Sequence, residues 1–556
     1  MLLSFLVIVI LTICNFCGVN IADSIYKNGN ILTVDSNFKI VTSVAIKDGK
    51  FIYVGSDKGE LNKFNGSKTK VVDLKGKNVL PGLNDAHIHF EDLCEKISMP
   101  DITNKSKEGI LAIIKKVADE SEPGEWIVSN GWNNNLWNDT SWPNKAELDA
   151  VTGDHPTILQ RIDMHTIWAN SLAIEVAGIK ETDCDPRGGI IIRDSAGKIQ
   201  GVFIDEAKKP FLTSLSTLTN EEKLALWKVG QKKLFSSGIT SFTDPGKVVP
   251  TKTVSEDIAL LKSAYEKGVM KIRDYRLIPI YDFDDFLLKG NKAELNLFSG
   301  KLSFNGVKIF ADGSFGSHSA WLSNDYADTP GNHGKPYLSN EELYKIVKKI
   351  RINGFQVASH AIGDESISQI LQVYKQVQKE FPTNDERYRI EHFSLPKEVD
   401  VKKAVDEGVI LVIQPYFAPS DAELIEKELI MENQLLAYPW RTAYDYGAIL
   451  AGSSDGPVEN YNPFEGIYAA VTRKGVNSNF TEAFNPNQNL TRKEALKLYT
   501  INAAYSQFAE NIKGSIEVGK YADFIVIDRD YGSVPVDELK DIKVLKTVLA
   551  GEVVYS

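Results

Sequence analysis

Cysteine is scarce in this sequence, with four residues in a chain of 556. Cys14 and Cys17 lie in an apolar N-terminal run, which leaves Cys94 and Cys184 in the rest of the chain. Two thiols are too few for a disulfide framework in a chain of this length, so the sequence is not that of a disulfide-rich scaffold. A single bridge between Cys94 and Cys184 stays open at this point.

Blocks of like charge are also absent. The formal net charge is -11, and the acidic residues are spread along the chain without a run of five or six like charges. This excludes the electrostatic pattern typical of proteins that bind nucleic acid or an anionic membrane. A hydrophobic content of 43% and a charged content of 25% are typical of a folded globular protein. We therefore expect a small, neutral or modestly charged substrate.

The N-terminal apolar run, from Leu2 to about Cys17, is too short for a membrane span, which needs about 20 residues. It predicts a signal peptide over residues 1–22, cleaved near Ala22, and a protein that is secreted or held in the lumen of the secretory pathway. Because no Lys or Arg precedes the run, an uncleaved anchor is the alternative. Five glycosylation sequons begin at Asn65, Asn104, Asn138, Asn479 and Asn489, and they apply if the host is a eukaryote.

Both ends of the chain are rich in β-segments. Residues 23–80 contain short β-like runs separated by Asn-Gly, Asp-Gly and Gly-Lys turns, and residues 508–556 contain further runs joined by a Gly-Glu turn. We expect the two ends to pair into one small β-sandwich.

The middle of the chain, residues 81–507, alternates apolar strands with helical segments, as in GVKIFADGS, NEELYKIVKKIRINGF, QVASHAIGD and ESISQILQVYKQVQKEF. This βαβα order predicts an α/β fold with a parallel sheet, and we favour a (β/α)₈ TIM-type barrel over an open sheet. The segment exceeds the roughly 250 residues of such a barrel. Residues 100–216 are therefore expected to be an insertion after the first strand.

The segment LPGLNDAHIHF contains the sharpest chemical signal, because His87 and His89 are two residues apart after an apolar run. Residues i and i+2 of a strand project to the same face, so both imidazoles can reach one metal ion. The alternative is that the pair consists of two ordinary polar residues at a strand end.

Three further residues occur in segments of one kind, in which an apolar strand ends in a potential metal ligand. They are His360 in GFQVASH, His392 in RYRIEH and Asp455 in GAILAGSSD. Taken singly, each is more often a core histidine or a helix-capping aspartate. Because the carboxyl ends of barrel strands meet at one rim, the set predicts a shared site.

Lys308, inside the apolar strand FNGVKIFADGS, needs a compensating partner if it is buried. Two readings stay open from the chemistry alone. Lys308 carries a carbamate that bridges two metal ions, or it forms a salt bridge to Asp312 or another carboxylate.

His165 lies in QRIDMHTIWANSLAI, in a turn between a predicted strand and a helix predicted to begin at Ala169–Asn170. Loops at this position can face a binding pocket, so we expect His165 to contact substrate. The alternative is a structural histidine within the insertion.

These segments together resemble the amidohydrolase superfamily, specifically its amidohydrolase-3 or YtcJ-like branch, which includes N-substituted formamide deformylases. The resemblance covers nearly the whole mature chain. It is carried by PGLNDAHIHF, GWNNNLWNDTSWPNKAELDAV, QRIDMHTIWANSLAI, GITSFTDPG, KIFADGSFGSHSAWL, SHAIGD, RIEHF, AGSSDGPVE and GSIEVGKYADFIVID. The His pair is specific for the superfamily, and KIFADGS, SHAIGD and the GW to ANS insertion are specific for the branch.

The resemblance implies a role for each candidate ligand. His87, His89 and Asp455 are expected to bind one divalent metal, with zinc the expected element, and His360 and His392 to bind a second one. Lys308, as N-carboxylysine, is expected to bridge the two ions. Whether one or two ions bind is left open by the residues themselves.

The implied reaction is hydrolysis of a carbon–nitrogen bond other than a peptide bond, in amide or formamide small molecules, with Asp455 as general base and acid. The alternatives are a lactone or ester hydrolase using the same site, and a non-catalytic secreted protein that retains the fold. The expected partner is a small-molecule substrate, with no nucleic acid and no membrane beyond the leader. A homo-oligomer stays open.

Overall fold

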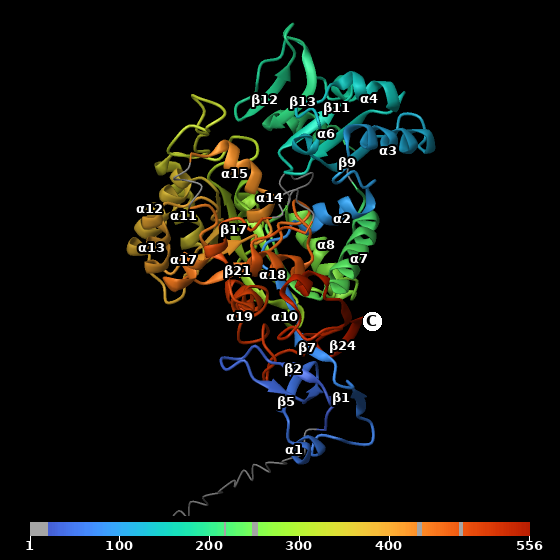
Figure 1. Ribbon diagram of the computed structural model, residues 1–556, viewed down its shortest axis with the longest axis vertical. Coiled ribbons are helices and arrows are strands. Elements are labelled where there is room, and N and C mark those ends of the chain that lie inside the picture. The colour runs from blue at the N-terminus through green and yellow to red at the C-terminus, as the bar shows by residue number, and fades with distance from the viewer. Residues whose placement is uncertain (1–20, 216–217, 247–253, 431–435, 477–481) are drawn as a thin grey trace, which may run out of the picture.

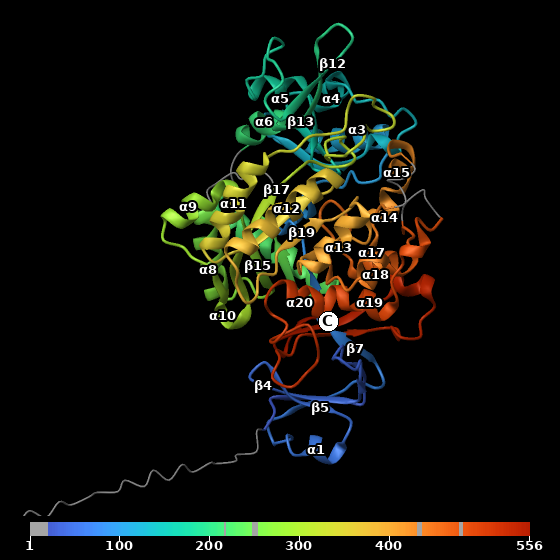
Figure 2. The same ribbon diagram turned by 90° about the vertical axis from the view of Figure 1, so that its left-hand side faces the viewer.

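The computed structural model describes residues 21–215, 218–246, 254–430, 436–476 and 482–556. Figure 1 and Figure 2 show three parts along the longest axis: an insertion at the top, a barrel in the middle and a β-sandwich at the bottom. The predicted leader falls on residues outside this range, except for Ile21 and Ala22. Ala22 is buried in the sandwich, where its amide donates to Phe64 O at 2.8 Å.

Eight parallel strands of the central sheet form a barrel in sequence order. They are β8 (Leu83–Asp85), β14 (Ile239–Asp244), β15 (Arg273–Pro279), β17 (Leu302–Phe310), β18 (Gln356–Ala361), β19 (Arg389–His392), β20 (Ile410–Ile413) and β21 (Leu450–Gly452). A ninth strand, β16 (Glu294–Asn296), pairs antiparallel with β17. The first and last strands approach each other, since Ala86 N donates to Gly452 O at 3.0 Å. The predicted (β/α)₈ barrel is confirmed, and its strand ends therefore share one rim.

Helices cover the outside of the barrel on both sides (Figure 1). They include α7 (Asn220–Ser236), α8 (Val254–Glu266), α11 (Asn340–Ile352), α12 (Asp364–Glu380), α13 (Glu398–Asp406), α17 (Trp440–Asp445) and α18 (Pro463–Thr472). Helix α12 shows why they pack, because its buried Ile367, Ile370, Leu371 and Tyr374 recur at helical spacing on one face. Capping boxes at Ser339 and Thr219 start α11 and α7.

The two chain ends form the expected sandwich. A four-stranded sheet contains β1 (Ser24–Lys27), β4 (Ser43–Lys47), β5 (Lys50–Gly55) and β6 (Lys70–Asp73). A six-stranded sheet combines β2 (Asn30–Leu32), β3 (Ile40–Val41) and β7 (Asn78–Pro81) with β22 (Phe524–Ile527), β23 (Val544–Leu549) and β24 (Glu552–Tyr555). The antiparallel β7–β22 pair joins the N-terminal and C-terminal segments, and Tyr26, Phe51 and Phe524 lie in the shared core.

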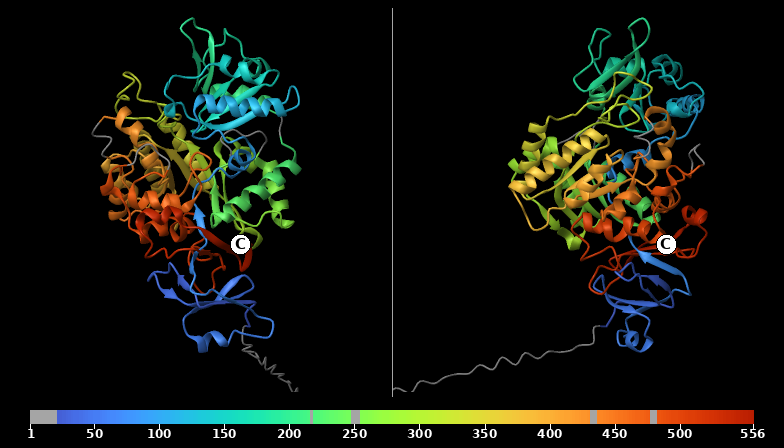
Figure 3. Two further views of the ribbon diagram at one scale, coloured as in Figure 1. Left: turned by 45° about the vertical axis from the view of Figure 1, so that its right-hand side comes forward. Right: turned by 60° about the vertical axis from the view of Figure 1, so that its left-hand side comes forward.

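The insertion follows β8 and α2 (Phe90–Ser98) and has a sheet of its own. Its strands are β9 (Ile127–Trp132), β10 (Thr157–Arg161), β11 (Thr166–Ala169), β12 (Gly189–Arg193) and β13 (Ile199–Asp205), flanked by α3 (Lys107–Glu120), α4 (Lys145–Thr152) and α5 (Ser171–Val176). Trp132 and Trp168 sit in its separate core. Figure 3 shows this part at the end of the barrel opposite the sandwich.

The structure also bears on the cysteines, the sequons and the search for membrane spans. Cys94 is buried and Cys184 is exposed, and both are free thiols, so the bridge left open by the sequence is not formed. Asn65, Asn104, Asn138 and Asn489 are exposed, and Asn479 lies outside the described residues. No helix in the described ranges has the length and apolar character that a membrane span requires.

Candidate metal centre

All six predicted ligands meet at one rim of the barrel. His87 and His89 follow β8, Asp455 follows β21, and the other three lie on neighbouring strands: Lys308 on β17, His360 on β18 and His392 on β19. Each is buried, with at most 8% of its surface exposed. The predicted convergence of six residues from five barrel strands is therefore present.

The first group consists of His87, His89 and Asp455. Asp455 Oδ1 lies 3.3 Å from His87 Nε2 and 3.3 Å from His89 Nε2. Two ligand atoms bound to one tetrahedral zinc ion at its usual bond lengths lie about 3.3–3.6 Å apart. The spacing of these three side chains is therefore that of ligands sharing one ion.

The second group consists of His360 and His392, and it lies beside the first group. The ring centroids of His360 and His392 are 4.5 Å apart, and those of His87 and His392 are 5.2 Å apart. Lys308 Nζ lies 3.4 Å from His87 Nε2, between the two groups. Asp312, the alternative partner of Lys308, is occupied elsewhere, because its oxygens accept hydrogen bonds from Trp321 N, Ile362 N, Gly363 N and Ser366 Oγ.

Each of the four imidazoles uses one nitrogen to contact a protein acceptor, which leaves its other nitrogen available. His87 Nδ1 faces Glu391 Oε2, His89 Nδ1 faces Gly246 O at 2.9 Å, and His392 Nδ1 faces Gln414 Oε1 at 2.9 Å. His360 is reversed, with Nε2 3.1 Å from Gly313 O. Partners of this kind fix the tautomer and the ring orientation of metal-bound histidines.

The charge states of these groups favour a cation. Burial lowers the pKa of His87 and His392 well below the usual range and that of His360 to about 3, so these rings are neutral and able to coordinate. Burial opposes protonation of His89 too, but the contact with Asp455 raises its pKa to about 9. A bound cation would take the place of that proton.

Asp455 supplies the clearest test of whether this donor set fits a metal. Its Oδ1 is buried and makes no hydrogen bond to any described residue, although two imidazole nitrogens lie beside it. A buried carboxylate oxygen without a hydrogen bond is costly unless a cation compensates it. Four histidines and a carboxylate are a ligand set suited to zinc and related divalent ions, so the residues fit such an ion.

The amidohydrolase family matches this sequence over residues 70–555. The chain belongs to the amidohydrolase family. Family membership and the donor set together identify an enzyme of the hydrolase class that depends on a divalent metal. The resemblance read from the sequence is thereby confirmed.

Relatives span nearly the full length of this amidohydrolase. This chain is 32% identical to Protein LONG AFTER FAR-RED 3 of Arabidopsis thaliana over 550 residues, which cover 96% of this chain and 92% of that protein. It is 29% identical to the amidohydrolase YtcJ of Bacillus subtilis, over 96% and 99% of the two chains. It is 27% identical to the N-substituted formamide deformylase of Arthrobacter pascens, over 96% and 98%.

Solved structures agree with this assignment. A metal-dependent hydrolase of Pyrococcus horikoshii superposes with a TM-score of 0.75 at 27% identity, over 92% of this chain and 99% of that one. A metal-dependent hydrolase of Pyrococcus furiosus gives a TM-score of 0.73 at 26% identity, over 92% and 100%.

The groups that orient the histidines of this amidohydrolase were not predicted from the sequence. Glu391 contacts His87 and accepts hydrogen bonds from Arg389 Nε at 2.7 Å and Nη2 at 3.0 Å, and all three side chains are fully buried. The alternation in RYRIEH could have indicated the pairing of Arg389 with Glu391, because these residues are two apart in a strand and share its inner face. Gln414 and Gly246 carry no comparable signal, since only the folded barrel brings them to His392 and His89.

Gln414→Met is expected to weaken metal binding by about 10–100-fold, because His392 loses the acceptor that fixes its ring. Methionine has a volume similar to that of glutamine and introduces no buried charge. The metal dissociation constant, measured by competition with a chelator, gives the result. Gln369→Met is the matched control, because Gln369 is equally buried but lies on α12 and bonds Leu338 O and Asn340. Equal affinities in both variants would contradict this role.

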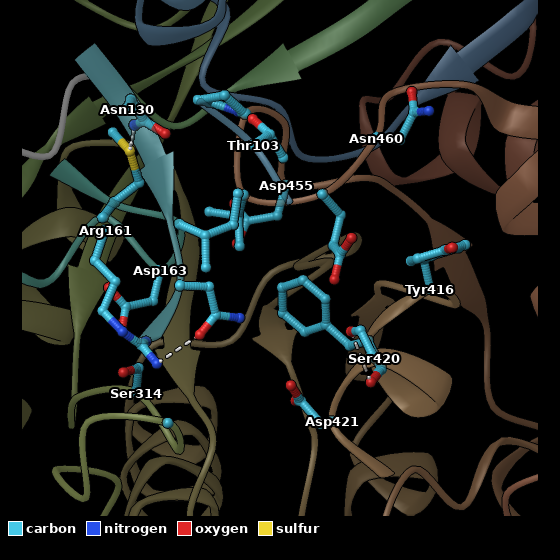
Figure 4. Close-up of a pocket in the computed structure, with 18 of the residues that line it drawn as sticks. Thr103, Asn130, Arg161, Asp163, Ser314, Tyr416, Ser420, Asp421, Asp455 and Asn460 are labelled. Carbon is cyan, nitrogen blue, oxygen red and sulfur yellow. Dashed lines mark hydrogen bonds and ion pairs between the residues drawn. The ribbon is translucent and has the colours of Figure 1, made fainter. Parts of the chain in front are cut away.

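A cavity of about 730 Å³ reaches the predicted metal ligands, five of which line it. Figure 4 shows Arg161 and Asp163 of the insertion on one side, with Asp455, Tyr416 and Asp421 of the barrel across from them. The insertion therefore closes over the rim and contributes part of the wall. This size suits a small molecule rather than a polymer.

His165 lines this cavity, in agreement with a turn that faces the pocket, while its contact with substrate stays a prediction. Its Nδ1 lies 2.6 Å from Asp205 Oδ1, which holds the ring and leaves Nε2 for another partner. The local structure differs in one respect from the prediction, because β11 (Thr166–Ala169) comes between His165 and the helix. The helix α5 begins at Ser171, with Asn170 as its N-cap.

Proposed function

We propose that this amidohydrolase cleaves a carbon–nitrogen bond other than a peptide bond in small molecules of the amide or formamide type. The observation that carries the proposal is Asp455 Oδ1, which is buried, makes no hydrogen bond to the described residues and lies 3.3 Å from both His87 and His89. Similarity to the N-substituted formamide deformylase supports the substrate class.

In this proposal zinc is bound by two groups of ligands. His87, His89 and Asp455 would hold one ion, and His360 and His392 would hold a second. Lys308, which lies 3.4 Å from His87 Nε2, would be a ligand to both as N-carboxylysine. When bound, such ions would supply Lewis-acid chemistry, which activates water and polarises a carbonyl group.

Asp455 performs the proton transfers. Its carboxylate accepts a proton from the attacking water while a carbon–oxygen bond forms at the carbonyl carbon. It then donates that proton to the leaving nitrogen as the carbon–nitrogen bond breaks. The products are a carboxylic acid, which is formic acid for a formamide, and an amine.

The environment of Lys308 supports carboxylation in this proposal. Only the neutral amine can attack carbon dioxide, and burial lowers the pKa of Lys308 to about 8. The Nζ atom lies 3.4 Å from His87 Nε2, and the carboxylates of Glu391 and Asp455 only partly offset the effect of burial on this pKa. A carbamate would turn this buried cation into an anion that binds metal, which removes the cost of burying a lone charge.

A substrate screen tests the proposed function. The zinc-loaded enzyme is assayed against a library of formamides, N-acyl amines, lactones and simple esters, with metal content measured on the same sample. We expect turnover of formamides or N-acyl amines. Turnover confined to lactones or esters would replace the proposal with the alternative reaction at the same site, and no turnover by a fully loaded enzyme would overturn both.

His165→Ala is expected to lower kcat/KM by about tenfold, the effect of one lost hydrogen bond to substrate, without changing metal content. His333→Ala serves as the control, because His333 is exposed and pairs with Asp325 outside the cavity. An unchanged kcat/KM in His165→Ala would exclude the contact.

We also propose that the enzyme is exported after cleavage near Ala22 and is glycosylated at exposed sequons if its host is a eukaryote. The exposure of Asn65, Asn104, Asn138 and Asn489 supports the second part. N-terminal sequencing of protein from the culture medium tests the export. A chain that still begins at Met1 would contradict it.

A further inference from the structure

We propose that His318, Asp328 and Glu428 form a second site for a divalent cation, separate from the catalytic centre. His318 and Asp328 lie in the long segment between β17 and α11, and Glu428 is the last residue of α15 (Ala422–Glu428). One ligand atom from each of these three residues lies within 4.8 Å of the other two. The site would therefore join two segments that are about a hundred residues apart in the sequence.

The distances within the group are those of ligands around one ion. His318 Nε2 lies 3.0 Å from Asp328 Oδ1 and 3.6 Å from Glu428 Oε2. Atoms bound to one tetrahedral zinc ion lie about 3.3–3.6 Å apart, so a small adjustment would place all three at bonding distance. One imidazole with two carboxylates is a donor set that favours zinc or manganese over calcium, which prefers oxygen ligands alone.

Glu428 provides an independent indication of a missing partner. The residue is only 3% exposed, and its Oε2 makes no hydrogen bond to any described residue. That oxygen points toward His318 at a distance too long for a hydrogen bond. A buried carboxylate oxygen in this state is costly, and a cation between Glu428, His318 and Asp328 would compensate it.

The surrounding structure holds these side chains in place. Ala327 N donates to Glu428 O at 2.8 Å, which fixes Asp328 beside the end of α15. The ring of His318 packs on the buried ring of Tyr326, with centroids 4.6 Å apart. The side chains of His318 and Asp328 are 25% and 27% exposed, which gives a cation access from solvent.

None of the three ligands lines the catalytic cavity, but their segments do. Ser314 and Phe315 come from the β17–α11 segment, and Asp421 and Leu424 come from the chain around α15. A cation at the new site would therefore fix two parts of the cavity wall relative to each other. Its role is structural, and it takes no part in bond cleavage.

The competing account is an ion pair between His318 and Asp328 alone, without any metal. In that account Glu428 beside the pair is a neutral buried acid, and a glutamine of the same shape would replace it without loss. The metal account predicts the opposite, because an amide is a much poorer ligand than a carboxylate. The substitution Glu428→Gln therefore separates the two.

The test uses the full-length purified enzyme saturated with zinc and then freed of excess metal. Metal content per chain and Tm are measured for the parent, for the double variant Asp328→Asn/Glu428→Gln and for Asp325→Asn. Asp325 is a matched control, because it lies in the same segment and pairs with His333 at 3.3 Å. We expect the double variant to hold one zinc fewer per chain than the parent and the control.

The response of Tm to zinc gives the second readout. After treatment with a chelator, added Zn²⁺ should raise the Tm of the parent in two steps, one of which is absent from the double variant. If the double variant does not fold, Glu428→Gln alone should raise the dissociation constant of that step at least tenfold. Equal zinc content and equal zinc-dependent Tm in variants and parent would overturn the proposal.

Discussion

The Asp455→Asn enzyme is expected to keep much of its metal and to lose at least about 10³-fold in kcat. Asparagine retains an oxygen that can coordinate beside His87 and His89, but it cannot accept the proton of the attacking water. General acid–base groups contribute about 10²–10⁴-fold, and in the proposed mechanism Asp455 is both base and acid. Metal analysis and kcat are measured on the same preparation.

A control substitution separates this effect from a general loss of charge. Asp406→Asn, on the outer helix α13, removes a carboxylate that is exposed and remote from the cavity. It should leave kcat unchanged. Near-normal turnover in a metal-loaded Asp455→Asn enzyme would refute the assignment of Asp455 as the proton carrier.

The Lys308→Ala enzyme is expected to bind one ion fewer per chain and to lose at least about 10²-fold in kcat. In the proposed site, removal of the Lys308 side chain would leave His360 and His392 as the only protein ligands of the second ion, which is too few to hold it. A metal ion contributes several kcal/mol to stabilising the charge that develops in the reaction, and each 1.4 kcal/mol is about tenfold in rate.

Chemical rescue distinguishes the carbamate from a simple cationic lysine. A small carboxylate such as acetate or propionate can occupy the space left in Lys308→Ala and bridge the ions, so it should restore part of the activity. Lys301→Ala, immediately before the opposite end of β17, is the control and should keep full activity and metal. Unchanged metal content in Lys308→Ala would show that Lys308 bridges nothing.

Much of the catalytic site follows from the sequence because barrel geometry makes strand ends equivalent. His360, His392 and Asp455 share no sequence neighbourhood, yet each ends an apolar run, and the parallel order brings such ends to one rim. The shared site of His87 and His89 was predicted from one rule, that residues two apart in an extended chain project to the same face. The sandwich was predicted equally simply, from β-rich segments at both ends.

Contacts that depend on how separate segments pack could not be predicted. Gln414 reaches His392 from the next strand, and nothing in its local sequence marks it as a partner of a ligand. Glu428 and His318 meet because α15 and the β17–α11 segment pack together, which no periodic pattern encodes. The strand β11 was missed because the three residues between His165 and the helix predicted at Ala169–Asn170 were assigned to the turn.

Diffraction at the zinc absorption edge, from crystals of the zinc-loaded enzyme, tests the central claim most directly. The account predicts an anomalous peak about 2.0–2.2 Å from His87 Nε2, His89 Nε2 and Asp455 Oδ1, with a second peak beside His360, His392 and Lys308. A fully loaded enzyme whose zinc lies elsewhere, with no peak among these six side chains, would contradict it.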